Sequence, residues 1–289
     1  MCIRDSVKHK QVTAPVSLAD LTTRAGQELL WQWLENPNVV GVFLAPPCGS
    51  ASRARAIRLH HKSHCKHHQG PRPLRSDDHP NGLPHLAWTD KERIAKANIL
   101  YRLTADVVRW AAAQRIPVVV ENPQYSFFWN TTFWTEVSNL MSYTTFHSCQ
   151  YGSLRQKRTM IAFSDREFRV ISKKCKGQSA KHKHAKWGIN NRTSKFATAE
   201  ETAYPMALAK AFAACFITAL ASRGLPMPAA TLELATEAVT PSLQVIRAQT
   251  GLQAKASFVP PLVPCYSHHV LLVGSHASLP AIDLSLIHI

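Results

Sequence analysis

The sequence has few acidic residues, no long apolar run and no regular cysteine spacing. Its 289 residues contain 18 Asp and Glu against 34 Lys and Arg, which gives a formal net charge of +16. No apolar run reaches the roughly 20 residues that a membrane-spanning helix needs. Seven irregularly spaced cysteines in a chain of this length do not form a disulfide scaffold. These absences argue against an integral membrane protein, a small secreted module and an acidic scaffold.

What the chain does have is a globular composition with concentrated positive charge. Apolar residues make up 45% and charged residues 18%, which is not the composition of a disordered basic tail. The segment from Arg53 to Arg75 carries seven basic residues and no acid, and the segment from Arg155 to Arg192 carries twelve basic and two acidic residues. Two basic segments on a nearly neutral body predict a surface that contacts nucleic-acid phosphates, with a solvated basic face as the alternative. The candidate contacts are Arg53, Arg55, Arg58, Arg72, Arg75, Lys173 and Lys174.

Both ends of the chain are predicted to be sequencing artefacts. Residues 1–6 and 284–289 correspond to the translation of a transposon adapter that is commonly used in sequencing libraries and of its reverse complement. Neither hexamer is therefore expected to contribute to the native fold. The remainder is interpreted as one folded domain over residues 7–225, truncated at its N-terminal side, followed by a Pro-containing tail or linker over residues 226–283.

Apolar periodicity predicts alternating helices and strands. Helices are expected near residues 18–36, 91–114, 133–141 and 199–222, and strands near 39–44, 116–120, 143–148, 159–163 and 168–172. Continuous apolar runs such as Val39–Leu44 are typical of parallel strands that are buried on both faces. The predicted fold class is therefore α/β. In such sheets, functional sites form just beyond the carboxyl ends of the strands.

Three short motifs lie beside these strands, in order. The first buried strand is followed by Pro46-Pro47-Cys48-Gly49-Ser50-Ala51-Ser52, the second by Glu121-Asn122-Pro123, and the strand near 159–163 is preceded by Tyr151-Gly152-Ser153-Leu154-Arg155-Gln156-Lys157-Arg158. Together they resemble the DNA cytosine-5 methyltransferases. The wider pattern, with segments 52–55, 70–76 and 196–199, resembles the divergent methyltransferase-like domains of some eukaryotic retroelements. The resemblance covers roughly residues 39–221.

The resemblance implies a partial doubly wound, Rossmann-like methyltransferase sheet whose N-terminal cofactor-binding strands are missing. It implies S-adenosyl-L-methionine as the methyl donor of the full-length parent, and DNA rather than a membrane as the partner. Cys48 would add as a thiolate to a flipped cytosine, with Glu121 facing the base and Lys157 assisting. The implied supporting residues are Pro46, Pro47, Ser52, Asn122, Arg155 and Arg158. Such an enzyme would be intracellular, and nuclear in a eukaryote.

Departures from the family pattern leave alternatives open. Gly49 stands where the family usually has Gln, Pro123 where it has Val, and Arg158 lies one position off the expected register. No Gly-x-Gly occurs anywhere in the chain, so the loop that cradles the cofactor is missing. Truncation of a parent protein and degeneration of a retroelement copy would each explain this. The fragment alone is expected to be inactive, and the alternative function is a catalytically inactive, basic nucleic-acid-binding module.

A metal site is predicted in the second basic segment. Cys175, His182 and His184 are candidate zinc ligands, and Cys149 is a further one. A plain basic loop is the alternative, because the segment has no paired Cys-x-x-Cys. A second tract, His60 to His68 with Cys65, fits no known zinc module in its spacing.

Overall fold

The computed structural model describes residues 20–37, 39–56, 71–190, 195–196, 204–224, 269–275 and 282–288. Arg58 and the histidine-rich tract at 60–68 lie outside the described residues, as does the start of the helix predicted near 199–222. Within the described part, no helix is long and apolar enough to cross a membrane.

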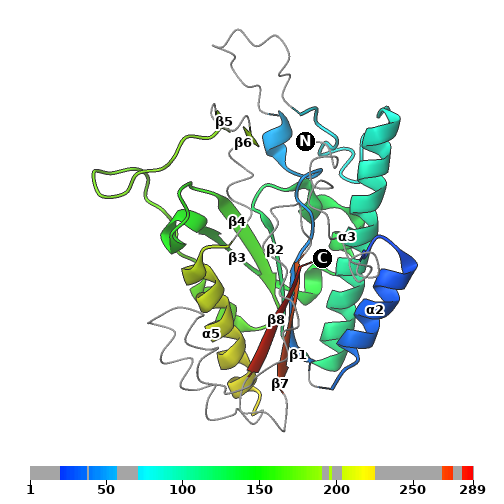
Figure 1. Ribbon diagram of the computed structural model, residues 1–289, viewed down its shortest axis with the longest axis vertical. Helices are drawn as coiled ribbons and strands as arrows, with labels where there is room; N and C mark the ends of the chain where they lie inside the picture. Colours follow the sequence, from blue (N-terminus) through cyan, green and yellow to red (C-terminus); the bar gives the residue numbers. More distant parts are fainter. Residues whose placement is uncertain are drawn as a thin grey trace, which may run out of the picture.

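A mixed β-sheet with the order β3-β4-β2-β1-β7-β8 forms the centre of the molecule (Figure 1). Its strands are β1 (Val39–Ala45), β2 (Val118–Pro123), β3 (Ser142–His147), β4 (Arg158–Phe163), β7 (His269–Ser275) and β8 (Ile282–His288). Strands β1 and β2 are parallel, whereas β4 runs antiparallel to both β2 and β3. Beyond β1 the sheet continues with β7 and β8, which come from the region interpreted above as tail and adapter.

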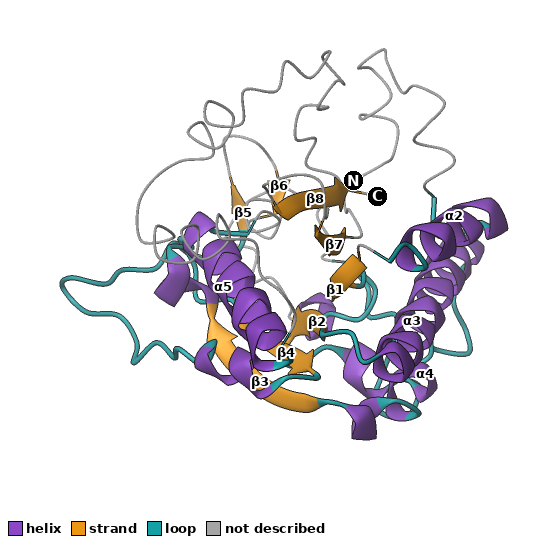
Figure 2. Cartoon of the chain, turned by 90° about the horizontal axis from the view of Figure 1, so that it is seen from below, coloured by secondary structure: helices purple, strands orange, loops and turns teal. Residues whose placement is uncertain are grey.

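Helices cover both faces of the sheet (Figure 2). On one face lie α2 (Arg24–Leu34) and α3 (Trp88–Gln114), and on the other lies α5 (Met206–Ser222). Because successive strand residues point to opposite faces, Val42 packs in the cluster with α2 and α3, while its neighbour Phe43 packs with α5. This two-sided burial explains the uninterrupted apolar run of β1.

The remaining described elements are short. They are the helix α4 (Thr132–Thr135), the 3₁₀ turns η2 (Arg53–Ala56), η3 (Phe127–Asn130), η4 (Ser138–Leu140), η5 (Ser148–Tyr151) and η6 (Arg166–Val170), and the two-residue strands β5 (Ile189–Asn190) and β6 (Lys195–Phe196). Most of them lie between β2 and α5, where they carry the chain around the edge of the sheet.

The predicted α/β class is confirmed, and the sheet is a mixed one. The strand expected near 168–172 is wrong, because this segment forms the 3₁₀ turn η6. The turn is closed by the Ile171 N–H, which donates to the Phe168 carbonyl at 3.1 Å. Both side chains are buried, and their spacing of three residues brings them to one side of a 3₁₀ turn. The helix expected over 133–141 is also shorter, since it is divided into α4 and η4.

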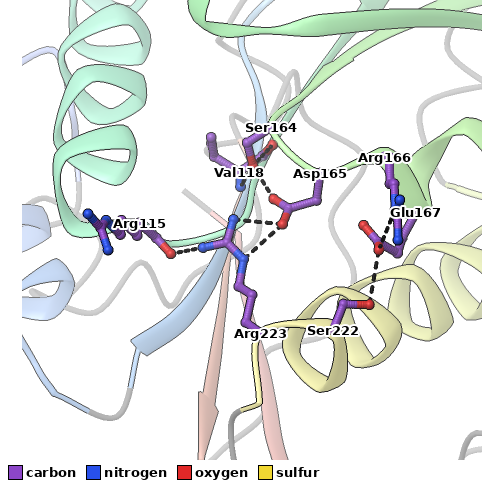
Figure 3. Close-up of polar contacts among 8 residues, drawn as sticks. All are labelled: Arg115, Val118, Ser164, Asp165, Arg166, Glu167, Ser222 and Arg223. Carbon is purple, nitrogen blue, oxygen red and sulfur yellow. Dashed lines mark hydrogen bonds and ion pairs between the residues drawn. The ribbon is translucent and has the colours of Figure 1, made fainter.

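Arg223 joins three elements at the end of the sheet where β2 begins (Figure 3). Its Nε and Nη2 donate to Asp165 Oδ1 at 2.8 and 2.6 Å, and its Nη1 donates to the Arg115 carbonyl. Asp165 follows β4, and Arg115 is the left-handed residue that ends α3. This contact ties the C-terminal ends of α3 and α5 to the sheet, so it orders the scaffold from the edge opposite the Cys48 loop.

Candidate functional site

The Cys48 loop and Glu121 meet at the carboxyl edge of β1 and β2. Strand β1 ends at Ala45, three residues before Cys48, and Glu121 lies near the end of β2. Because β1 and β2 are neighbouring parallel strands, these ends lie side by side. The Cys48 carbonyl accepts from the N–H groups of Ala51 and Ser52 at 3.0 and 2.8 Å, which closes the loop into a tight turn.

Two buried side chains hold the proline pair in front of Cys48. Asn122 Nδ2 donates to the Pro46 carbonyl at 2.8 Å, and the Tyr101 hydroxyl donates to the Pro47 carbonyl at 2.6 Å. Both side chains are almost fully buried. Since proline has no N–H and a restricted φ, a loop anchored through its two proline carbonyls has little freedom to move. The Cys48 thiol is thereby placed by β2 and α3 together.

Glu121 is a buried carboxylate. One of its oxygens accepts a hydrogen bond, and the other faces a cation. Only 5% of Glu121 is exposed. Its Oε2 accepts from the Tyr204 hydroxyl at 2.8 Å, and its Oε1 lies 3.7 Å from Lys157 Nζ. Among the described residues, no hydrogen-bond partner reaches Oε1. Oε1 is thus a buried acceptor whose nearest described cation is the Lys157 ammonium.

Cys48 lies close enough to Glu121 and Lys157 for both charges to act on its thiol. Burial raises the pKa of the Cys48 thiol, the charge of Lys157 opposes this, and the charge of Glu121 adds to it. Burial beside Glu121 likewise holds the pKa of Tyr204 well above its ordinary value. A thiol, a carboxylate and an ammonium group thus converge from three separate segments of the chain.

Arg75 is placed inside the protein, not on its surface. It is 2% exposed, its Nη2 donates to Ser50 Oγ at 3.1 Å, and its guanidinium lies 5.0 Å from the centre of the Tyr101 ring. This buried position is not that of a phosphate contact. Arg75 instead braces the turn that contains Cys48 and Ser50.

Three other predicted basic residues also make contacts within the protein. Arg55 Nε donates to the Arg72 carbonyl at 2.8 Å, and its Nη1 donates to the Gly49 carbonyl at 3.3 Å. Arg53 pairs with Asp77 and lies 4.2 Å from the centre of the Phe127 ring. Arg155 is buried and its Nε donates to the Lys186 carbonyl at 3.0 Å. Arg53 and Arg55 therefore stabilise the segment that follows Cys48, in addition to lying at or near its surface.

Ser52, Arg72, Arg158, Lys173 and Lys174 lie at or near the surface of the described structure. Ser52 Oγ accepts from the Ala54 N–H at 3.2 Å and so helps to shape the chain after the Cys48 turn. Arg158 opens β4 directly after Lys157, and Lys173 lies beside the Tyr151 ring at 5.1 Å. Of the predicted phosphate contacts, Arg72, Lys173 and Lys174 remain candidates for contact with a polyanion.

Four metal-ligating side chains cluster beside β3 and β4. One ligand atom from each of Cys149, Cys175, His182 and His184 lies within 4.8 Å of the other three. Cys175 Sγ is 3.5 Å from His184 Nε2, which is 2.9 Å from His182 Nε2. Both thiols are buried and both imidazoles are half-buried. This cluster could hold a metal ion, and it unites the three predicted ligands with Cys149.

Sequence reasoning missed Tyr101, Tyr204 and the buried role of Arg75. Tyr204 precedes α5 and meets Glu121 across 83 residues of chain. The apolar pattern around Tyr204 predicts only that its ring packs in the core. It does not indicate that the Tyr204 hydroxyl donates to Glu121. A basic segment likewise does not show which of its arginines turns inward.

No family model matches this chain, and neither the curated proteins nor the solved structures contain a significant match.

Proposed function

We propose that this chain carries the thiol-addition site of a DNA cytosine-5 methyltransferase-like domain of the type found in retroelements. The observation that supports it is the convergence of Cys48, Glu121 and Lys157 at the carboxyl edge of two neighbouring parallel strands. A nucleophile, a proton donor or acceptor and a cation in one place are the groups that covalent catalysis on a cytosine requires.

In this proposal the Cys48 thiolate adds to C6 of a cytosine that has left the base stack. The Glu121 carboxylate first takes the proton of the Cys48 thiol. The Sγ–C6 bond then forms while the C5–C6 π electrons shift through the ring, and Glu121 passes that proton on to N3. Lys157 balances the charge that develops near O2. The neutral adduct has an electron-rich C5, and elimination returns the N3 proton to Glu121 and expels the thiolate. The second oxygen of Glu121, left without a hydrogen-bond partner among the described residues, is the one that would face N3.

The residues present do not fit a site for S-adenosylmethionine. The resemblance requires a glycine-rich loop for the cofactor, and the chain contains no Gly-x-Gly. The methyl donor is therefore proposed only for a longer parent protein, and no methyl-transfer step is derived for this chain.

The test uses duplex DNA in which the target cytosine is replaced by 2-pyrimidinone, a base that accepts a thiol at C6 without a methyl donor. We expect a covalent adduct, located at Cys48 by peptide mass spectrometry. Cys48→Ala should form none, whereas Cys215→Ala, which changes a buried core cysteine, should still form it. Absence of the adduct in the folded protein, or its persistence in Cys48→Ala, would refute the proposal.

The second candidate function is a catalytically inactive nucleic-acid-binding module, favoured by the exposed basic surface around residues 173–186. It predicts salt-dependent DNA binding that Cys48→Ala leaves unchanged, together with no adduct on 2-pyrimidinone.

We also propose that the metal held by Cys149, Cys175, His182 and His184 is zinc. Two thiolates and two imidazoles form a common structural zinc set. We expect about one zinc per chain, and the cobalt-substituted protein should show the thiolate bands of a tetrahedral site. His182→Ala should lose both, and His85→Ala, an exposed histidine outside the cluster, should keep both. A chain that binds no zinc or cobalt would disprove this assignment.

A further inference from the structure

Residues 171–188, here called the lysine loop, form a segment with no helix or strand. The loop carries six lysines and no acidic residue. All six, Lys173, Lys174, Lys176, Lys181, Lys183 and Lys186, are exposed. Figure 1 shows the loop in green, projecting beside β3 and β4. Because this segment carries many like charges and has little apolar surface, its own sequence does not favour a single conformation.

The metal ligands alternate with the lysines along this loop. Cys175 lies between two lysines, and His182 and His184 are on either side of Lys183. The ligands are buried or half-buried, whereas the neighbouring lysines face solvent. Because neighbouring side chains of an extended chain point to opposite sides, drawing the ligands inward onto one ion turns the lysines outward.

Apart from the cluster, the backbone hydrogen bonds that tie the described loop to the rest of the protein lie near its ends. The His147 N–H donates to the Lys173 carbonyl at 3.0 Å, and the Ala185 N–H donates to the Leu154 carbonyl at 2.8 Å. Between them, Ser179 and His182 bond to each other and close a local turn. An ion shared by Cys149 and the loop ligands would therefore be the main tie between the centre of the loop and the sheet.

The cluster lies close in the chain to the candidate thiol site. Cys149 belongs to η5, and the preceding residue, Ser148, donates its N–H to the Lys157 carbonyl at 3.0 Å. The Lys157 ammonium is in turn 3.7 Å from Glu121. Arg155, two residues earlier, binds the Lys186 carbonyl at the far end of the loop. Both ends of the lysine loop are thus bonded to segments next to the site.

We propose that metal binding at Cys149, Cys175, His182 and His184 shapes the lysine loop into a surface that holds DNA phosphates beside the Cys48 site, so that DNA affinity depends on the bound metal. This inference rests on the proposed function for its choice of DNA as the partner, but it requires no catalysis. Each lysine that neutralises a phosphate releases condensed counterions, so a surface shaped by the metal should be visible in the salt dependence of binding.

The experiment measures the affinity of the full chain for a fluorescent duplex between 50 and 300 mM KCl. It compares protein loaded with zinc, stripped by a chelator and reloaded. Loaded protein should bind at least about tenfold more tightly at low salt, and stripping should reduce the slope of log K against log salt by roughly 3 to 5. Reloading should restore both values. Equal affinity and equal slope in the loaded and stripped forms would overturn the inference, as would a chain that takes up no zinc.

Matched variants distinguish the effect of the bound metal from the effect of the lysine charges. His182→Ala should behave like the stripped protein, while His85→Ala should behave like the unchanged chain. The double variant Lys181→Glu/Lys183→Glu should keep its zinc and lose affinity, whereas Lys91→Glu, an exposed lysine on α3, should lose little. If the Lys181→Glu/Lys183→Glu variant binds DNA as well as the Lys91→Glu variant, the lysine loop is not the contact surface.

Two further outcomes keep this inference apart from the proposed function. Metal-dependent binding without a 2-pyrimidinone adduct would refute the thiol site alone, and an adduct with metal-independent binding would refute the inference alone. A single-stranded RNA competitor that displaces the duplex at a tenfold lower concentration would overturn the choice of DNA.

Discussion

The Cys48 thiol, held in a tight turn, is influenced by two opposite charges. Burial disfavours the thiolate, the Lys157 ammonium favours it, and the Glu121 carboxylate disfavours it. The net effect is a pKa of Cys48 above the ordinary value of a thiol. At neutral pH the thiol form therefore predominates. Removing the Lys157 charge should reduce the thiolate population, and removing the Glu121 charge should increase it.

Alkylation of Cys48 should report this balance. Its rate with iodoacetamide should rise with pH to values above 9, because only the thiolate reacts. At pH 8, Lys157→Met should raise the pKa of Cys48 and slow the reaction, and Glu121→Gln should lower the pKa and accelerate it, each by about threefold to tenfold. Peptide mass spectrometry measures modification at Cys48 itself. If both substitutions changed the alkylation rate in the same direction, the opposite influences of Lys157 and Glu121 on Cys48 would be contradicted.

Tyr204 is the residue that connects the candidate site to the opposite face of the sheet. It donates to Glu121 and packs edge-on against Phe43 at a centroid distance of 5.7 Å. Tyr204→Phe should keep the packing and remove the donor, leaving a buried carboxylate oxygen without its bond. The free energy of unfolding in urea should fall by about 1–3 kcal/mol. Tyr125→Phe, at a half-exposed position, should change it little, and an equal effect of the two variants would count against the contact.

At the scale of elements, the ends of α3 and α5 are joined to the sheet through one arginine. The Asp165 side chain is 9% exposed and accepts two hydrogen bonds from Arg223. Removing Arg223 leaves a nearly buried carboxylate without its cation, which is more costly than losing an exposed ion pair.

Arg223→Ala should therefore lower the free energy of unfolding by roughly 1–3 kcal/mol. Arg169→Ala, at an exposed position nearby, should have little effect. Because Arg223 acts at the edge opposite Cys48, the alkylation rate of Cys48 should stay the same in the folded variant. A change in that rate would show that the two edges are coupled.

The lysine loop should respond to metal as one element. Trypsin cleaves after lysine in chains that can adapt to its active site, and the loop exposes six lysines. Zinc-loaded protein should resist cleavage within residues 173–186, and chelation should accelerate cleavage there by about tenfold or more, in proportion to the opened population. Cleavage at sites outside the loop serves as the internal control. Equal rates with and without metal would show that the ion does not order the loop.

At the scale of the whole molecule, the two described cores and the metal cluster come from residues 21–220. Among the described residues, the predicted adapter reaches the sheet through β8, which pairs with β7. The site is carried by β1 and by the three strands on its other side, β2, β4 and β3.

Removal of residues 1–6 and 284–289 should leave the site intact. The zinc content and the pH dependence of Cys48 alkylation should be those of the full chain, and the free energy of unfolding should change by less than about 0.5 kcal/mol, as for most changes away from a core. Thermal unfolding, metal analysis and alkylation measure the three properties. Loss of the folded state would show that β8 is needed at the edge of the sheet.

Local pattern was sufficient for the parts of the fold in which burial repeats along the chain. The run of β1 predicted a strand covered on both faces, and its abrupt end at Pro46 marked the position of Cys48. The segment around Phe168 was misassigned, since a short apolar stretch has the same composition in a strand and in a 3₁₀ turn. Hydrophobicity alone cannot choose between them without the neighbouring elements.

The sequence by itself determined the α/β alternation, the positions of Cys48 and Glu121 at strand ends, and the concentration of positive charge in two segments. Only the tertiary structure decided that Tyr204 holds Glu121, that Arg75 turns inward beneath Ser50, and that Cys149 joins the other three metal-ligating side chains. The physical reason is that periodicity and charge are properties of neighbouring residues. The partner of a single hydroxyl, guanidinium or thiol is set by chain segments that approach only when the sheet and its helices have packed.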